Sequence, residues 1–149
     1  MKTLRISDKI LVPNRNKMSL LLAFDLIDIL HECMKYSNKL WIAWAVDCIG
    51  SHWDEILTEA PNKQVQLSFY ELLDYGRDVT QTLDGYFLAV STERSSIQNI
   101  PNIKHFKDCL EISDLIIRAF DASFWEVTSS DEQLLDKLAT KFKETTIYG

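Results

Sequence analysis

The sequence predicts one domain of mixed α and β structure, spanning residues 1–149, with a central mixed sheet of four to five strands and three main helices. A chain of 149 residues fits a single domain, and it contains no internal repeat, low-complexity segment or linker-like stretch. Short apolar runs alternate along the chain with amphipathic segments of helical period. Only four Gly and three Pro are present, so most residues should lie in regular elements. The pattern leaves open whether the class is α/β or α+β, with two layers or three.

The first half of the chain predicts two strands and two helices. Residues 3–12 are expected to form a strand, with a turn at 8–9. Residues 16–36 carry apolar side chains around most of a helical circumference, which predicts a long, largely buried helix. Residues 40–47 form a continuous apolar run, typical of a strand covered on both faces. A short helix is expected to begin near Ser51 and to end near Pro61.

The second half begins with a clearer helix signal. Ser68 and Glu71 form a capping box, and the apolar face that follows predicts a helix to about Thr82. The later patterns predict a turn at 84–85, a strand over 86–90, a loop over 91–102 and a short helix within 103–112. Residues 115–127 are expected to be extended, with either a break into two strands or a bulge at 122–123. A final helix is capped within 129–133.

Composition and charge exclude several classes of partner. The net charge is −6 and the pI about 5.0, with no cluster of Lys and Arg, so we expect neither nucleic-acid nor membrane binding. The longest apolar stretch, 18–30, is short and interrupted by Asp25 and Asp28, so we expect no membrane span. We also expect no secretory signal. Three widely spaced cysteines without a metal-binding spacing indicate free thiols in a cytoplasmic protein.

The ends of two apolar runs supply the first candidate site. One run stops at Asp47 and another at Asp121. If the two strands are parallel neighbours, both carboxylates lie at the carboxyl edge of the sheet, where open α/β folds place their sites. Cys48 and His52 follow Asp47 closely and could supply a nucleophile and a base. These four residues are the candidate catalytic set, for a small hydrolase or a metal-dependent enzyme. The alternative is that they are ordinary residues at strand and helix ends.

The second candidate is an acidic stripe on the predicted long helix. Asp25, Asp28 and Glu32 are spaced by three and four residues, which places them on one helical face. Acidic residues on two helices can together hold a metal ion, but this sequence contains no second acidic helix of matching pattern. The sequence therefore does not identify a metal. The stripe is then either the solvated edge of a buried helix or a surface that binds a basic partner.

The tryptophans lead to a third alternative. Trp41 and Trp44 point to opposite faces of their strand because their spacing is odd. Core packing is the default interpretation for both, and for Trp53 and Trp125. A pocket lined by Trp41, Trp44 or Trp125 would instead indicate a small-ligand binder, and an exposed Trp beside acidic residues would indicate an interface anchor.

No phosphate-binding loop, dinucleotide fingerprint or nucleophile elbow is present, so the sequence predicts no cofactor. The function that it favours is a non-enzymatic protein–protein interaction module, an inhibitor or immunity-type partner of a basic protein. The enzyme that uses Asp47 and Asp121 is the alternative.

Overall fold

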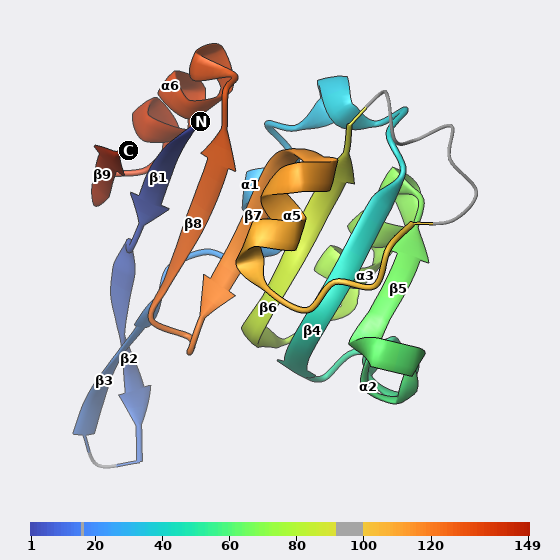
Figure 1. Cartoon of the computed structure of the whole chain (residues 1–149). Coiled ribbons are helices and arrows are strands. Elements are labelled where there is room, and N and C mark those ends of the chain that lie inside the picture. Colours follow the sequence, from blue (N-terminus) through green and yellow to red (C-terminus); the bar gives the residue numbers. More distant parts are fainter. Residues whose placement is uncertain (16, 92–99) are drawn as a thin grey trace.

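The computed structural model describes residues 1–15, 17–91 and 100–149, so most of the predicted loop at 91–102 lies outside the described residues. A seven-stranded sheet organises these residues, in the order β5-β4-β6-β7-β8-β1-β9 (Figure 1). Its strands are β1 (Lys2–Ile6), β4 (Trp41–Ile49), β5 (Gln64–Leu67), β6 (Gln81–Val90), β7 (Ser113–Phe120), β8 (Phe124–Ser129) and β9 (Thr145–Tyr148). A separate hairpin consists of β2 (Lys9–Asn14) and β3 (Lys17–Leu22).

Five α-helices accompany the strands within the described residues: α1 (Leu26–Leu30), α2 (Asp54–Glu59), α3 (Phe69–Asp78), α5 (Phe106–Ile112) and α6 (Glu132–Lys141). Two short 3₁₀ turns are η1 (Met34–Tyr36) and η2 (Pro61–Lys63). The mixed α and β class is therefore confirmed. The sheet is larger than the expected four to five strands, and its recorded strand pairs are antiparallel, not mixed.

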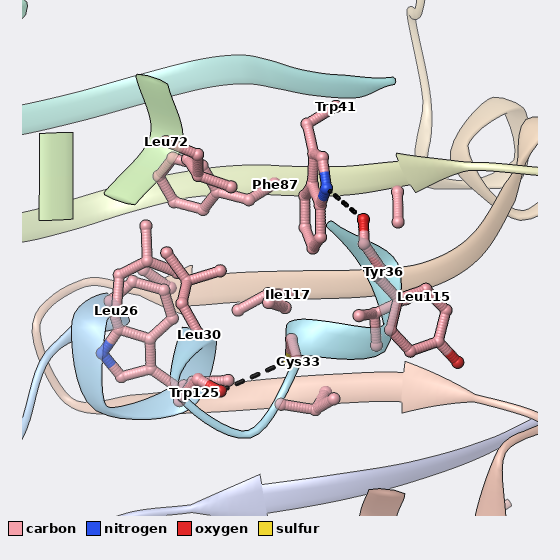
Figure 2. Packing of buried hydrophobic residues seen from close by; sticks show 14 of the residues in the cluster. Leu26, Leu30, Cys33, Tyr36, Trp41, Leu72, Phe87, Leu115, Ile117 and Trp125 are labelled. Atoms are coloured by element: carbon pink, nitrogen blue, oxygen red, sulfur yellow. Dashed lines mark hydrogen bonds between the residues drawn. The ribbon is translucent and has the colours of Figure 1, made fainter. Parts of the chain in front are cut away.

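The main core lies on one face of the sheet, under α1, α3 and α6. Figure 2 shows Trp41, Phe87, Ile117 and Trp125 from the strands packed against Leu26 and other helical residues. The indole nitrogen of Trp41 donates a hydrogen bond to the carbonyl of Tyr36 at 3.1 Å, so the one polar atom of this buried ring is satisfied. Trp41 and Trp44 do point to opposite faces, as their spacing predicts.

The expected long helix over 16–36 is wrong. Residues 17–22 pair with β2 as a strand, and the helix that follows has only five residues. Asp25 explains where this helix begins, since its carboxylate accepts the backbone N–H of Leu26 and its own N–H donates to Asp28. Two of the three carboxylates expected on one helix face, Asp25 and Asp28, thus form a capping box.

The expected turn at 84–85 is also wrong, because β6 runs continuously from Gln81. Gly85 has φ +145°, and a Cβ there would lie 2.8 Å from Val46, so glycine allows β4 and β6 to approach closely. Other predictions are confirmed: the strand at β4, the Ser68–Glu71 capping box of α3, a break between β7 and β8, and a final helix capped within 129–133. The N-cap of that helix is Asp131.

Among the helices of the described ranges, none has the length and apolar character needed to cross a membrane.

Candidate functional site

The second face of the sheet is only partly covered. Helix α5 and Ile103 pack on Ile42, Leu88 and Ile116, forming a small second core. In Figure 1, α5 lies in front of β6 and β7, whereas no element lies in front of β8 and β1. The part of this face that α5 leaves open carries most of the polar and aromatic side chains discussed below.

One row of directly opposed residues crosses this open area. Trp44 on β4 faces Tyr86 on β6, Tyr86 faces Arg118 on β7, Arg118 faces Glu126 on β8, and Glu126 faces Arg5 on β1. Directly opposed residues share one side of a sheet and lie close enough to interact. The fold thus assembles this row from five strands.

Rings and guanidinium groups stack continuously along this row and its neighbour. The ring centroids of Trp44 and Tyr86 are 4.6 Å apart. The Arg118 guanidinium lies 4.6 Å from the Tyr86 centroid and 3.6 Å from that of Phe120. Phe120 stacks on Phe124 at 4.6 Å, and the Arg5 guanidinium lies 4.0 Å from Phe124. These distances fit aromatic pairs and cation–π contacts. We call this set the aromatic–arginine row: Trp44, Tyr86, Arg118, Phe120, Phe124 and Arg5.

The charges of the row are unevenly compensated. Arg5 donates to one Glu126 oxygen through Nε at 3.2 Å and Nη2 at 3.1 Å, so this cation is neutralised within the protein. The stacked rings are the recorded contacts of Arg118. Burial raises the pKa of Tyr86 and nearby Arg118 opposes that shift, so the hydroxyl is protonated at neutral pH and can donate a hydrogen bond.

Three aspartates lie at the end of the sheet next to Trp44 and Tyr86. Asp47 on β4 directly faces Asp84 on β6, and both are exposed. Asp84 accepts the backbone N–H of Asp121 at 2.9 Å, in the turn between β7 and β8. We call Asp47, Asp84 and Asp121 the acidic rim.

Asp47 and Asp121 therefore lie at the same end of the sheet, but their strands are not neighbours. β6 separates β4 from β7 and runs antiparallel to both, which places the two residues about two strand spacings, roughly 10 Å, apart. The condition on which the candidate site depended, that the two strands are neighbours, is therefore not met.

The structure does not bring the four catalytic candidates together. Cys48 is buried in the main core, on the other side of the sheet from Trp44, and burial raises the pKa of its thiol. His52 lies between two helix carboxylates, with Nδ1 at 2.7 Å from Asp78 and Nε2 at 3.1 Å from Asp74. A thiolate–imidazole pair needs direct contact, and no contact between Cys48 and His52 is recorded within the described residues. Their catalytic role stays a prediction.

The described part of the chain shows no metal site either. Within residues 1–15, 17–91 and 100–149, no group of three or more His, Cys, Asp or Glu side chains is arranged to hold a metal ion.

The acidic stripe of the sequence is used in local contacts. Asp25 also accepts the N–H of Thr82 at 3.3 Å, and desolvation raises the pKa of this half-buried carboxyl. Asp28 caps the same helix, and Glu32 lies 3.7 Å from the ammonium group of Lys141. A role for Asp25, Asp28 and Glu32 in partner binding stays a prediction.

The other tryptophans mostly serve packing. Trp41 and Trp125 are fully buried, and Trp53 donates its indole N–H to Asp74 at 2.8 Å. Trp125 also lines a hollow of about 350 Å³ together with Leu22, Phe24 and Thr82. Its lining mixes polar and apolar groups, and nothing in it selects a particular ligand.

Sequence reasoning missed most of the aromatic–arginine row. Arg118 is the one residue whose sequence context indicates such a position. It is the one charged residue inside the run 115–120, so its side chain is expected to lie outside the core. Arg5 and Glu126 could not be paired, since 121 residues separate them along the chain. Comparisons with protein-family models, curated proteins and solved structures find no match to this chain.

Proposed function

We propose that this chain is a non-enzymatic binding module that recognises a basic protein partner through the aromatic–arginine row and the acidic rim. The observation that carries the proposal is the continuous stacking of four aromatic rings and two guanidinium groups on a sheet face that α5 leaves partly open.

The residue types support binding of a protein. Trp, Tyr and Arg are the residues most enriched among those that dominate the energy of protein interfaces. In this chain they are anchored on paired strands and held by their neighbours, so little side-chain entropy remains to be lost on binding. A preformed surface of this kind does not require a conformational change.

The charge balance supports a basic partner. Of the two arginines in the row, Arg5 is already paired with Glu126. The three carboxylates of the acidic rim therefore outweigh Arg118, on a chain whose net charge is −6. Opposite potentials accelerate encounter and select against like-charged proteins. The proposed setting is the cytoplasm, which the three free thiols favour.

The test is affinity capture from a lysate of the native host, followed by calorimetry with the captured partner. The site variant combines Asp47→Lys with Phe120→Ala, which alters the acidic rim and the row without touching the main core. We expect wild type to capture a basic protein, and the site variant to bind it at least about tenfold more weakly. Binding should also weaken as salt is added.

The matched control combines Asp136→Lys with Met34→Ala, at exposed positions on α6 and η1. It makes the same charge change and also truncates an apolar side chain, so it should retain wild-type affinity. The proposal fails if the site variant binds as wild type does, or if the partner that depends on this surface is acidic.

A further inference from the structure

The hairpin of β2 and β3 extends away from the rest of the molecule. In Figure 1 it projects beyond the end of β1, and its strands pair with each other, apart from the seven-stranded sheet. The backbone hydrogen bond from Ala23 N–H to the Asp8 carbonyl, at 2.9 Å, closes its base. We call residues 9–22 the arm.

Apolar side chains are exposed on both faces of the arm. Ile10 and Leu21 are directly opposed on one face, and both are exposed. Leu11 and Met18 lie on the other face and are 60% and 56% exposed. A two-stranded hairpin alone is marginally stable in water, and an exposed apolar surface of this kind marks an interaction site. The arm therefore needs a surface that covers it.

The charge of the arm indicates what that surface is. The arm carries three cations, Lys9, Arg15 and Lys17, and no carboxylate, while the whole chain has a net charge of −6. The rest of the chain therefore carries −9. Two arms placed against each other would repel, whereas an arm placed on the body of this chain is attracted.

A complement on the body, in both charge and apolar character, is the surface of α2 and α3. Residues 54–78 carry six carboxylates against two cations, Lys63 and Arg77. All six carboxylate residues are exposed: Asp54, Glu55, Glu59, Glu71, Asp74 and Asp78. Two apolar side chains are exposed among them, Ile56 and Tyr70, the latter at 67%. The two surfaces are thus complementary: the arm combines positive charge with exposed apolar side chains, and α2–α3 combines negative charge with exposed apolar side chains.

The arm cannot reach this surface within its own chain. It follows β1, whereas α2 packs on β4, and three strands lie between β1 and β4. Four strand spacings amount to roughly 19 Å across the sheet. In Figure 1 the arm extends along the strand direction at the left of the molecule, whereas α2 lies at the right. Any contact between the arm and α2–α3 is therefore intermolecular.

From the exposed arm and its charge complement, we propose that the arm of one molecule binds the α2–α3 surface of a second copy of this chain, reciprocally, to form a dimer. A two-fold dimer uses both contacts and closes, so no filament forms. The proposal goes beyond the proposed function, since neither surface includes a residue of the aromatic–arginine row or the acidic rim.

The first test is the mass in solution, measured by sedimentation equilibrium from low micromolar to millimolar protein at low salt. We expect wild type to reach twice 17.3 kDa. Leu11→Ser with Met18→Ser should remain at the monomer mass, and both positions are exposed, so the fold should survive. Met34→Ser with Leu110→Ser removes two exposed apolar side chains elsewhere and should dimerise as wild type does.

The second test exchanges charges. Arg15→Glu with Lys17→Glu on the arm should weaken dimerisation, as should Glu55→Lys with Glu59→Lys on α2. A mixture of these two variants should associate again, because both reciprocal contacts of the mixed dimer are then of opposite charge: the Glu arm faces the Lys-substituted α2, and the native arm faces the native α2. A wild-type chain that stays monomeric, a dimer insensitive to the arm variants, or charge variants that do not complement each other would each overturn the proposal.

Discussion

The ring centroids of Trp44 and Tyr86 lie 4.6 Å apart, on the face of the sheet opposite Trp41. Two tryptophans three residues apart therefore have different surroundings. Trp41 is fully buried and hydrogen-bonded, while Trp44 is half-buried at the border of the open face. Their contributions to stability and to binding should differ accordingly.

Replacement of Trp41 by alanine should cost about 3–5 kcal/mol in the free energy of unfolding, since it leaves a large cavity in the main core. Trp44→Ala should cost about 1–2 kcal/mol, because part of that ring is already in water. Urea unfolding of the two variants, followed by circular dichroism, measures the difference. Equal losses would contradict the assignment of the two faces.

The capping box of α3 gives a smaller effect. Ser68 Oγ accepts the N–H of Glu71 at 3.1 Å, and the Glu71 carboxylate accepts the N–H of Ser68 at 2.9 Å. Ser68→Ala should lower the free energy of unfolding by about 1 kcal/mol. Ser130→Ala is the control, because Asp131 and not Ser130 caps α6, and it should leave stability within about 0.5 kcal/mol of wild type. A loss at Ser130 equal to that at Ser68 would refute the assignment.

The carboxyl of Asp131 should make stability depend on pH. Desolvation raises its pKa, but hydrogen bonds from Lys35, the N–H of Leu134 and the Tyr36 hydroxyl outweigh that effect and hold the pKa below its usual value of 3.8. A carboxyl with a lowered pKa in the folded state stabilises the protein above its ordinary pKa. That contribution is lost as pH falls through the lower, folded-state pKa.

Asp131→Asn keeps a capping oxygen but removes the charge. The variant should be less stable than wild type at neutral pH, and the difference should shrink as pH falls below about 4. Urea unfolding at several pH values compares the two proteins. A difference that does not change with pH would mean that the charge of Asp131 contributes nothing.

The three cysteines should react slowly with thiol reagents in the folded protein. Burial raises the pKa of Cys33 and that of Cys109 to about 12 in each case, so little thiolate is present at neutral pH. Cys48 is the least enclosed of the three and should react first. A disulfide-exchange dye should therefore titrate three thiols in denaturant, but at most one rapidly in the native state, and Cys48→Ser should abolish that one. Rapid labelling of Cys33 would contradict its burial.

Local patterns predicted those elements whose signals lie within a few residues. The apolar run of β4 and the capping residue Ser68 are examples, and each lies where expected. The cap of α6 was predicted only to within 129–133, and the structure places it at Asp131. The apolar residues of region 17–22 fit either a strand or a helix, so their pattern alone does not distinguish the two. Two features distinguish the hairpin from a helix: Arg15 has φ 58°, which is not helical, and Asp25 caps a helix that begins only after β3. Neither feature has a unique sequence signature.

The candidate site depended on information that the sequence does not contain locally. Asp47 and Asp121 could be placed at one end of the sheet, but the position of β6 between their strands, which brings in Asp84, is a property of strand order. The contact of the Arg5 guanidinium with the Phe124 ring likewise joins residues far apart in the chain. Strand order follows from the packing of the whole domain, so these contacts could not be read from spacing.

The place of β1 in the sheet has a consequence for how the chain folds. β1 lies between β8 and β9, and contacts such as that of Thr3 with Thr128 join residues 125 positions apart. Such contacts raise the relative contact order, and closing so long a loop slows folding. During synthesis on the ribosome, β1 therefore remains unpaired until β8 and β9 have left the exit tunnel. In that interval it needs protection from aggregation.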